Sequence, residues 1–149
     1  MLLIHRLFIK TSLVYLFMGA LAGGWMLLAQ TGVLAAPAIN LISIHAHLVG
    51  IGFFLQMVCG VALWMFPRKT GESRERAARD PLAWATYFLI TGGLAVRILA
   101  SLSATVFGNT MLAASTLLQL AGIMAFVVGI WPRVYLPGAK SMMQAASQK

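Results

Sequence analysis

The chain has 149 residues, of which 60% are hydrophobic and only 9% are charged. Those values exclude an ordinary water-soluble domain, because its surface needs far more polar groups to face water. Eleven Lys and Arg residues outnumber three Asp and Glu residues, for a net charge of +8. The basic residues form no stripe on one face, so we do not expect nucleic acid as a partner.

Four apolar runs are long enough to span a bilayer, which takes about 20 residues for roughly 30 Å of hydrocarbon. Each run ends at residues that stop helices or favour turns, such as Pro37, Gly108-Asn109 and Pro132. The first run is too long for a typical signal peptide. We therefore predict an all-α integral membrane protein: one four-helix transmembrane domain over residues 1–149, as an up-down bundle. The expected spans are Thr11–Leu34, Leu41–Phe66, Leu82–Val106 and Met111–Ile130, followed by a short tail, 131–149.

The positions of the basic residues predict how the bundle lies in the membrane. Ten of the eleven fall in the N-terminal segment, the loop between the second and third spans, and the tail, whereas the loops around Ala36 and Gly108 carry no charge. Cytoplasmic loops are those enriched in Lys and Arg. Both termini are therefore expected in the cytoplasm, with the protein in the plasma (inner) membrane and the lipid bilayer as its partner.

Few ionisable residues remain inside the expected spans. All three acidic residues, Glu72, Glu75 and Asp80, lie in the basic loop. The spans thus offer no carboxylate, which argues against a proton pump or an ion-coupled transporter. Ionisable groups at membrane depth mark functional sites, and we take His45, His47 and Arg97 as the candidate site residues.

The two histidines are separated by one residue near the outer end of the second span. At about 100° per helical residue their side chains point roughly 200° apart, so one metal ion would not readily take both. Two different haems, or two different interfaces, could take one histidine each. Two neutral imidazoles on one haem iron give a low-spin b-type centre. The alternative is that each histidine hydrogen-bonds a carbonyl of a neighbouring helix.

Arg97 is the one basic residue within a span. A rise of about 1.5 Å per residue places it roughly 22 Å from the start of the third helix, at a depth similar to that of the histidines. Its planar guanidinium group suits a carboxylate such as a haem propionate. The alternative is a side chain that extends to the outer head groups.

The segment His45–Pro67, HAHLVGIGFFLQMVCGVALWMFP, resembles the tenth transmembrane helix of subunit I of the haem-copper oxidase superfamily, which includes nitric oxide reductases. The resemblance covers 23 of the 149 residues. In that family the first histidine of the H-x-H pair ligates the high-spin haem and the second ligates the low-spin haem. It therefore implies haem b as cofactor, with His45 and His47 as ligands to haem iron. By helix order and depth, Arg97 corresponds to the arginines near the haem propionates.

The departures from that family matter as much as the match. The copper site needs three further histidines, and none follows His47, so we do not expect a complete oxidase or reductase. Family subunits have twelve helices in three groups of four, which implies a homotrimeric twelve-helix ring here. Each interface would then hold one His45 and one His47, and a shared bis-His haem b would transfer electrons. Two alternatives stay open: haem-based binding or sensing of NO or oxygen, and a non-catalytic structural or assembly subunit.

Overall fold

The computed structural model describes residues 2–37, 39–67, 73–102 and 106–134. Helix is the regular secondary structure throughout these residues, and four helices are long and apolar enough to cross a membrane, as the sequence predicts. The first is α1 (Leu3–Gln30); the third and fourth are α5 (Pro81–Leu102) and α6 (Val106–Ile130). The second consists of α2 (Leu41–His47), η1 (Leu48–Leu55) and α3 (Gln56–Met65).

The helix bounds differ from the expected spans by more than one residue at both ends of α1, at the end of α5 and at the start of α6. Helix α1 begins at Leu3 rather than Thr11, because Arg6 and Lys10 stand on one exposed face, where their charges reach outward while the backbone stays helical. It ends at Gln30, shortly before Gly32, whose φ of +77° does not continue a right-handed helix.

Helix α6 begins at Val106, so the Gly108-Asn109 pair lies inside the helix and not in a turn before it. In lipid a helix satisfies its own backbone groups, and this outweighs the weak turn preference of such a pair. The third helix was expected to reach Val106 and ends at Leu102; the residues that follow it, 103–105, lie outside the described part of the chain.

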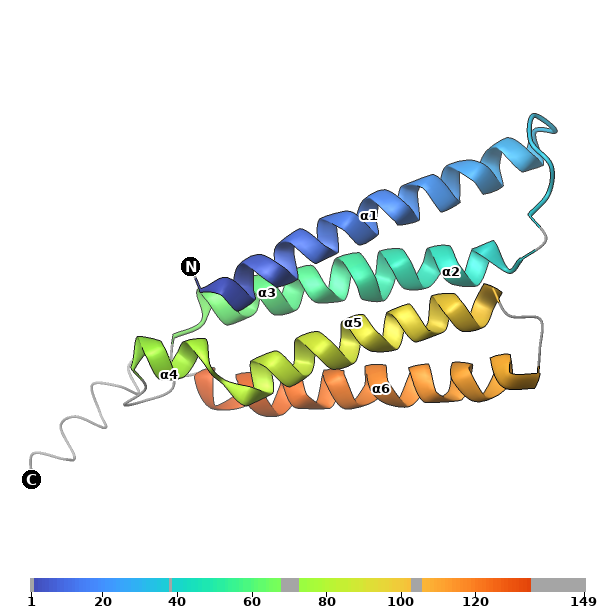
Figure 1. Cartoon of the computed structure of the whole chain (residues 1–149). Helices are drawn as coiled ribbons and strands as arrows, with labels where there is room; N and C mark the ends of the chain where they lie inside the picture. Colours follow the sequence, from blue (N-terminus) through green and yellow to red (C-terminus); the bar gives the residue numbers. More distant parts are fainter. Residues whose placement is uncertain (1, 38, 68–72, 103–105, 135–149) are drawn as a thin grey trace, which may run out of the picture.

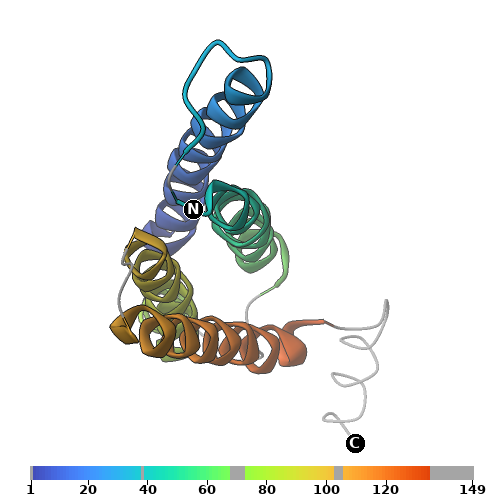
Figure 2. The same cartoon turned by 90° about the vertical axis from the view of Figure 1, so that its right-hand side faces the viewer.

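The four long helices form two antiparallel hairpins (Figure 1). Helix α1 packs along the second helix, and α5 packs along α6 over most of its length. Viewed from the end, the helices follow an open zigzag, with α5 and the second helix between α1 and α6 (Figure 2). We call the end with the chain's N-terminus the basic end, and the end where α1 stops and α2 begins the distal end.

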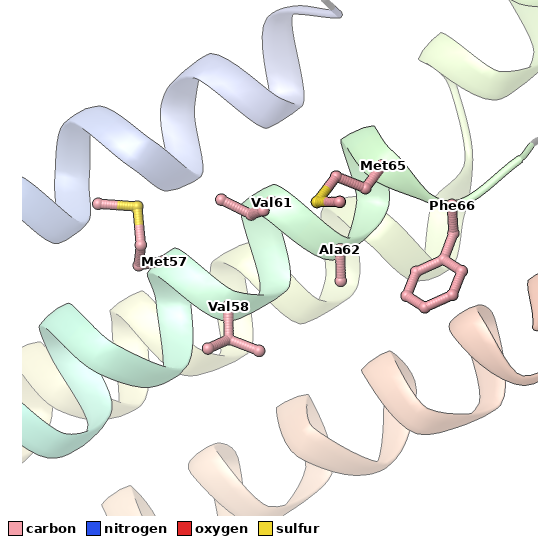
Figure 3. A pocket seen from close by; sticks show the side chains of 6 residues that line it. All are labelled: Met57, Val58, Val61, Ala62, Met65 and Phe66. Carbon is pink, nitrogen blue, oxygen red and sulfur yellow. The ribbon is translucent and has the colours of Figure 1, made fainter.

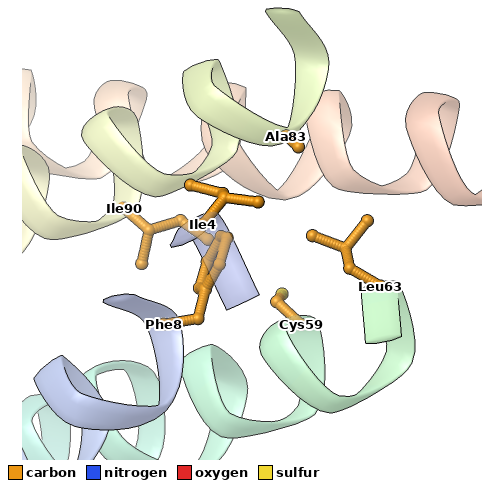
Figure 4. Packing of buried hydrophobic residues seen from close by; sticks show 6 residues of the cluster. All are labelled: Ile4, Phe8, Cys59, Leu63, Ala83 and Ile90. Carbon is orange, nitrogen blue, oxygen red and sulfur yellow. The ribbon is translucent and has the colours of Figure 1, made fainter. Parts of the chain in front are cut away.

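Two buried clusters join the hairpins. The larger one lies towards the basic end, where side chains of α1, α3 and α5 meet (Figure 4). The smaller one lies towards the distal end and consists of Tyr15, Ile44, Leu48 and Leu94. Close approach depends on glycine here: a Cβ at Gly52 would lie 2.8 Å from Tyr15 and Leu94. The larger cluster consists of Ile4, Phe8, Cys59, Leu63, Ala83 and Ile90.

A π-helix, η1, interrupts the second helix directly after His47. Such segments are rare, occur often at functional sites, and change which way the following residues face relative to a continuous α-helix. Gln56, the first residue after η1, is fully buried and donates from Nε2 to Thr91 Oγ1 on α5 over 2.7 Å. The π-helix thus turns a polar side chain inward, against the other hairpin.

A buried ion pair closes the basic end. Asp80 precedes α5; its Oδ1 accepts from the backbone N–H of Leu82 (3.1 Å) and its Oδ2 accepts from the Arg133 guanidinium group (2.7 Å). Arg133 belongs to the short helix η2 (Trp131–Arg133), after α6. Arg133 is only 3% exposed, whereas the sequence predicts it in a cytoplasmic tail. The rest of that expected tail, 135–149, lies outside the described residues.

Candidate functional site

His45 lies between α2 and α1. Helix α2 is capped by Asn40, whose Oδ1 accepts from the backbone N–H of Ser43 over 3.1 Å, and this fixes the first turn, directly before His45. The His45 Nδ1 atom is 2.8 Å from the carbonyl oxygen of Gly19. The ring also covers Gly23, where a Cβ would lie 2.9 Å from its Cε1 atom. Glycine at position 23 therefore makes room for the ring on α1.

His47 is held by its own helix. Its Nδ1 atom is 2.8 Å from the carbonyl oxygen of Ser43, one turn earlier. Ile44 and Leu48 are buried between the helices, and the two half-buried histidines flank them on the helix surface. His45 stands on the α1 side and His47 on the other flank, in line with the angular separation expected for an α-helix.

The hydrogen bonds settle which ring nitrogen carries the proton. A backbone carbonyl only accepts hydrogen bonds, so Nδ1 carries the hydrogen in both contacts. A neutral imidazole in this tautomer has its lone pair on Nε2. Within the described part of the chain, neither Nε2 atom has a hydrogen-bond partner. A histidine whose Nδ1–H is held by a carbonyl, with Nε2 free, is prepared to ligate a metal ion or haem iron.

Arg97 lies at the same level of the bundle. Its neighbour Leu94 belongs to the smaller buried cluster, and Ile98 packs against that cluster. The Arg97 Nε atom is buried and has no hydrogen-bond partner among the described residues. An unpaired N–H of a cation inside a membrane protein is costly. A hydrogen-bond acceptor would stabilise this side chain, and an anionic acceptor would also balance its charge.

One chain does not bring the three residues to a single point. His45 and His47 stand on different flanks of α2, and Arg97 is on another helix. Among the described residues, no group of three or more His, Cys, Asp and Glu side chains is placed to hold a metal ion.

The part of the site that sequence reasoning missed is the surface of α1 under His45. Gly19 and Gly23 are spaced as in the small-xxx-small pattern that lets membrane helices approach closely, and that spacing was a usable signal. Gln56 was missed as well: its Oε1 atom is buried without a partner in the described structure. A glutamine within an apolar run was the signal there.

A second apolar surface lies nearer the basic end. A groove of about 430 Å³ runs along α3, where Val58 and Phe66 point towards the α6 side and Met57 towards α1 (Figure 3). The Met57 sulfur accepts a long hydrogen bond, 3.8 Å, from the Ser12 hydroxyl group. Met57 thus packs within its own hairpin. The groove is also lined by Val61, Ala62 and Met65.

Comparison of the chain with protein-family models, characterised proteins and solved structures finds no match. The likeness to the haem-copper oxidase superfamily therefore rests on the H-x-H segment alone.

Proposed function

We propose that the chain is a membrane b-type haem protein that transfers electrons, with His45 and His47 as axial ligands through Nε2. One observation carries this proposal: both rings give their Nδ1 hydrogen to a backbone carbonyl and keep Nε2 free. A histidine that served only to join helices would need no such arrangement twice, two residues apart. Haem b, when bound, supplies a one-electron couple between ferric and ferrous iron.

The residues around the histidines fit a haem. Arg97 offers a buried N–H without a partner at the level of both rings, and a propionate carboxylate would satisfy it. Gly23 leaves the His45 ring in direct contact with α1, so its orientation is fixed. The carbonyl partners hold the imidazoles in one orientation. The chain's own residues thus bind and orient the group.

A second copy of the chain would complete the site. Because His45 and His47 stand on different flanks of α2, one chain does not offer both to one iron. In a homotrimeric twelve-helix ring, each interface would combine His45 of one subunit with His47 of the next. The open zigzag of helices, and the resemblance to a twelve-helix subunit, support this assembly. The charge pattern supports a plasma-membrane protein with its basic end in the cytoplasm.

The decisive experiment is a reduced-minus-oxidised absorption spectrum of the purified protein. We expect the bands of a low-spin b-type haem. Either His45→Ala or His47→Ala should abolish them, because each iron needs one ring of each kind, whereas His5→Ala at the basic end should leave them unchanged. A colourless wild-type protein rules out the haem, and a normal bis-His spectrum in one of the two variants rules out the shared site.

The competing function is that of a structural or assembly subunit, and the hydrogen bond from His45 to Gly19 of α1 favours it. In that case the protein is colourless and His47→Gln folds normally. Haem-based gas sensing is distinguished by carbon monoxide: a bis-His iron has no open position, so the reduced spectrum should not change. A shift of its main band would favour NO or oxygen binding.

A further inference from the structure

Helices α1 and α2 diverge at the distal end (Figure 1). A pocket of about 340 Å³ lies at this end. Its walls are the last turns of α1, the loop before α2 and the first residues of α2. Leu41 precedes His45 by one turn and Met26 follows Gly23 by about one turn, so the pocket begins roughly 5 Å outward from the His45 ring. The remaining lining residues are Ala29, Gln30, Ala36, Pro37, Ile39, Asn40 and Ile42.

Several contacts give the pocket a defined shape. The Trp25 indole Nε1 donates to the carbonyl oxygen of Ala35 over 3.2 Å, which ties the loop to α1. Gly32 reverses the chain with its positive φ. Asn40 caps α2 through Oδ1, so its amide hydrogens stay available for other partners.

The lining is apolar apart from two neutral amides, those of Gln30 and Asn40, at its exposed side. Residues 31–40 carry no charge. Soluble redox proteins are steered to their partners by complementary charge, and an anionic lipid head group seeks Lys or Arg. This end of the described structure offers neither feature near the pocket. Its chemistry fits an uncharged, lipid-soluble molecule whose head group carries carbonyl or hydroxyl oxygens.

We propose that this pocket binds the head group of an isoprenoid quinol, which is the electron donor of the protein. The donor role rests on the haem proposed above, whereas the binding itself does not. The quinol becomes the quinone by giving up two electrons and two protons. Each electron reduces one ferric haem iron to ferrous iron, and both protons pass to water at the distal end. The amides of Gln30 and Asn40 hydrogen-bond the head-group oxygens.

The binding test uses the full chain in phosphatidylcholine nanodiscs, titrated with decylubiquinone in a calorimeter, with empty nanodiscs as blank. Ala29→Phe fills the pocket and should weaken binding at least tenfold. Ala114→Phe, on the exposed face of α6, is the matched control and should stay within twofold. Gln30→Leu should weaken binding about threefold to tenfold. Unchanged affinity in Ala29→Phe overturns the proposal, as does equal binding of decylbenzene, which lacks the head-group oxygens.

A kinetic test separates this proposal from the haem itself. Decylubiquinol should reduce the wild-type haem in a stopped-flow experiment at least tenfold faster than that of Ala29→Phe, while dithionite reduces both equally. A haem protein whose Ala29→Phe variant is reduced by the quinol at the wild-type rate overturns the pocket and leaves the haem standing. A colourless protein that binds decylubiquinone overturns the haem and the donor role, and supports the binding site.

Discussion

The imidazole of His45 is fixed by α1 at two points: Nδ1 lies 2.8 Å from the carbonyl oxygen of Gly19, and the ring fills the space above Gly23. The same contact joins two helices and determines which ring nitrogen is free to bind a ligand. The packing of α1 on α2 and the orientation of the His45 ring are therefore coupled, because a change on α1 that moves the ring also moves its Nε2 atom.

Neighbouring glycines on α1 provide a direct test of this coupling. Gly23→Leu places a branched side chain where a Cβ alone would lie 2.9 Å from the His45 ring, whereas a Cβ at Gly24 would meet open space. We expect Gly23→Leu to lose most of the bis-His absorption, and Gly24→Leu to keep it. The test is the haem absorbance per mole of protein, measured on both purified variants. Equal haem content in the two variants would mean that the His45 orientation seen here is not the ligating one.

The existence and order of the four long helices follow from the sequence, because a long apolar run in lipid has few alternatives to a helix. The helix boundaries were harder to predict from the sequence. Arg6 and Lys10 precede the first apolar run and suggest that the helix begins after them, yet it begins at Leu3. Gly108-Asn109 looks like a turn and is helical. In both places the backbone keeps its hydrogen bonds, while local composition suggests a break.

The angular separation of His45 and His47 was predictable, since residues 41–47 form a regular α-helix. What each ring contacts was not. The Gly19 carbonyl comes from a helix 26 residues earlier, and only the packing of α1 on α2 brings it there. The π-helix after His47 contains no Pro and no charged residue that would predict it. It precedes Gln56, whose side chain faces inward.

Arg97 should influence the proposed haem through its charge. A cation near the iron favours the reduced state, which carries one more electron, so Arg97→Gln should lower the midpoint potential by roughly 60 mV, a tenfold change for one electron. Arg97→Lys keeps the charge and should shift the potential less. Potentiometric titration of the purified protein measures both. Arg79→Gln, exposed at the basic end, serves as the control, and an equal shift there would remove the special role of Arg97.

The ion pair between Asp80 and Arg133 should dominate the stability of the basic end. Both side chains are almost fully buried, and replacement of Asp80 removes the carboxylate that pairs with the buried Arg133 guanidinium group, a loss of about 3–5 kcal/mol. Asp80→Asn should therefore lower the free energy of unfolding by about that amount, measured by titration with sodium dodecyl sulfate. Arg74→Met, exposed on α4 (Arg74–Ala78), should change it by less than about 0.5 kcal/mol. The double variant Asp80→Asn/Arg133→Met should recover part of the loss.

The orientation of the bundle is accessible through cysteine labelling. The one native cysteine, Cys59, is buried, and Cys59→Ala provides a background without a thiol. Ala36 at the distal end and Glu75 on α4 are both exposed, and each can be replaced by cysteine. A membrane-impermeant maleimide reacts only with thiols that face its own compartment, because the charged reagent does not cross the hydrocarbon.

With the basic end in the cytoplasm, intact cells should label Ala36→Cys, and Glu75→Cys only after permeabilisation. Vesicles turned inside out should give the reverse pattern. Labelling of Glu75→Cys in intact cells would invert the topology, and it would place His45, His47 and the distal pocket next to the cytoplasm. The protons released from the quinol would then enter the cell instead of leaving it, so this measurement also determines the direction of the proposed proton release.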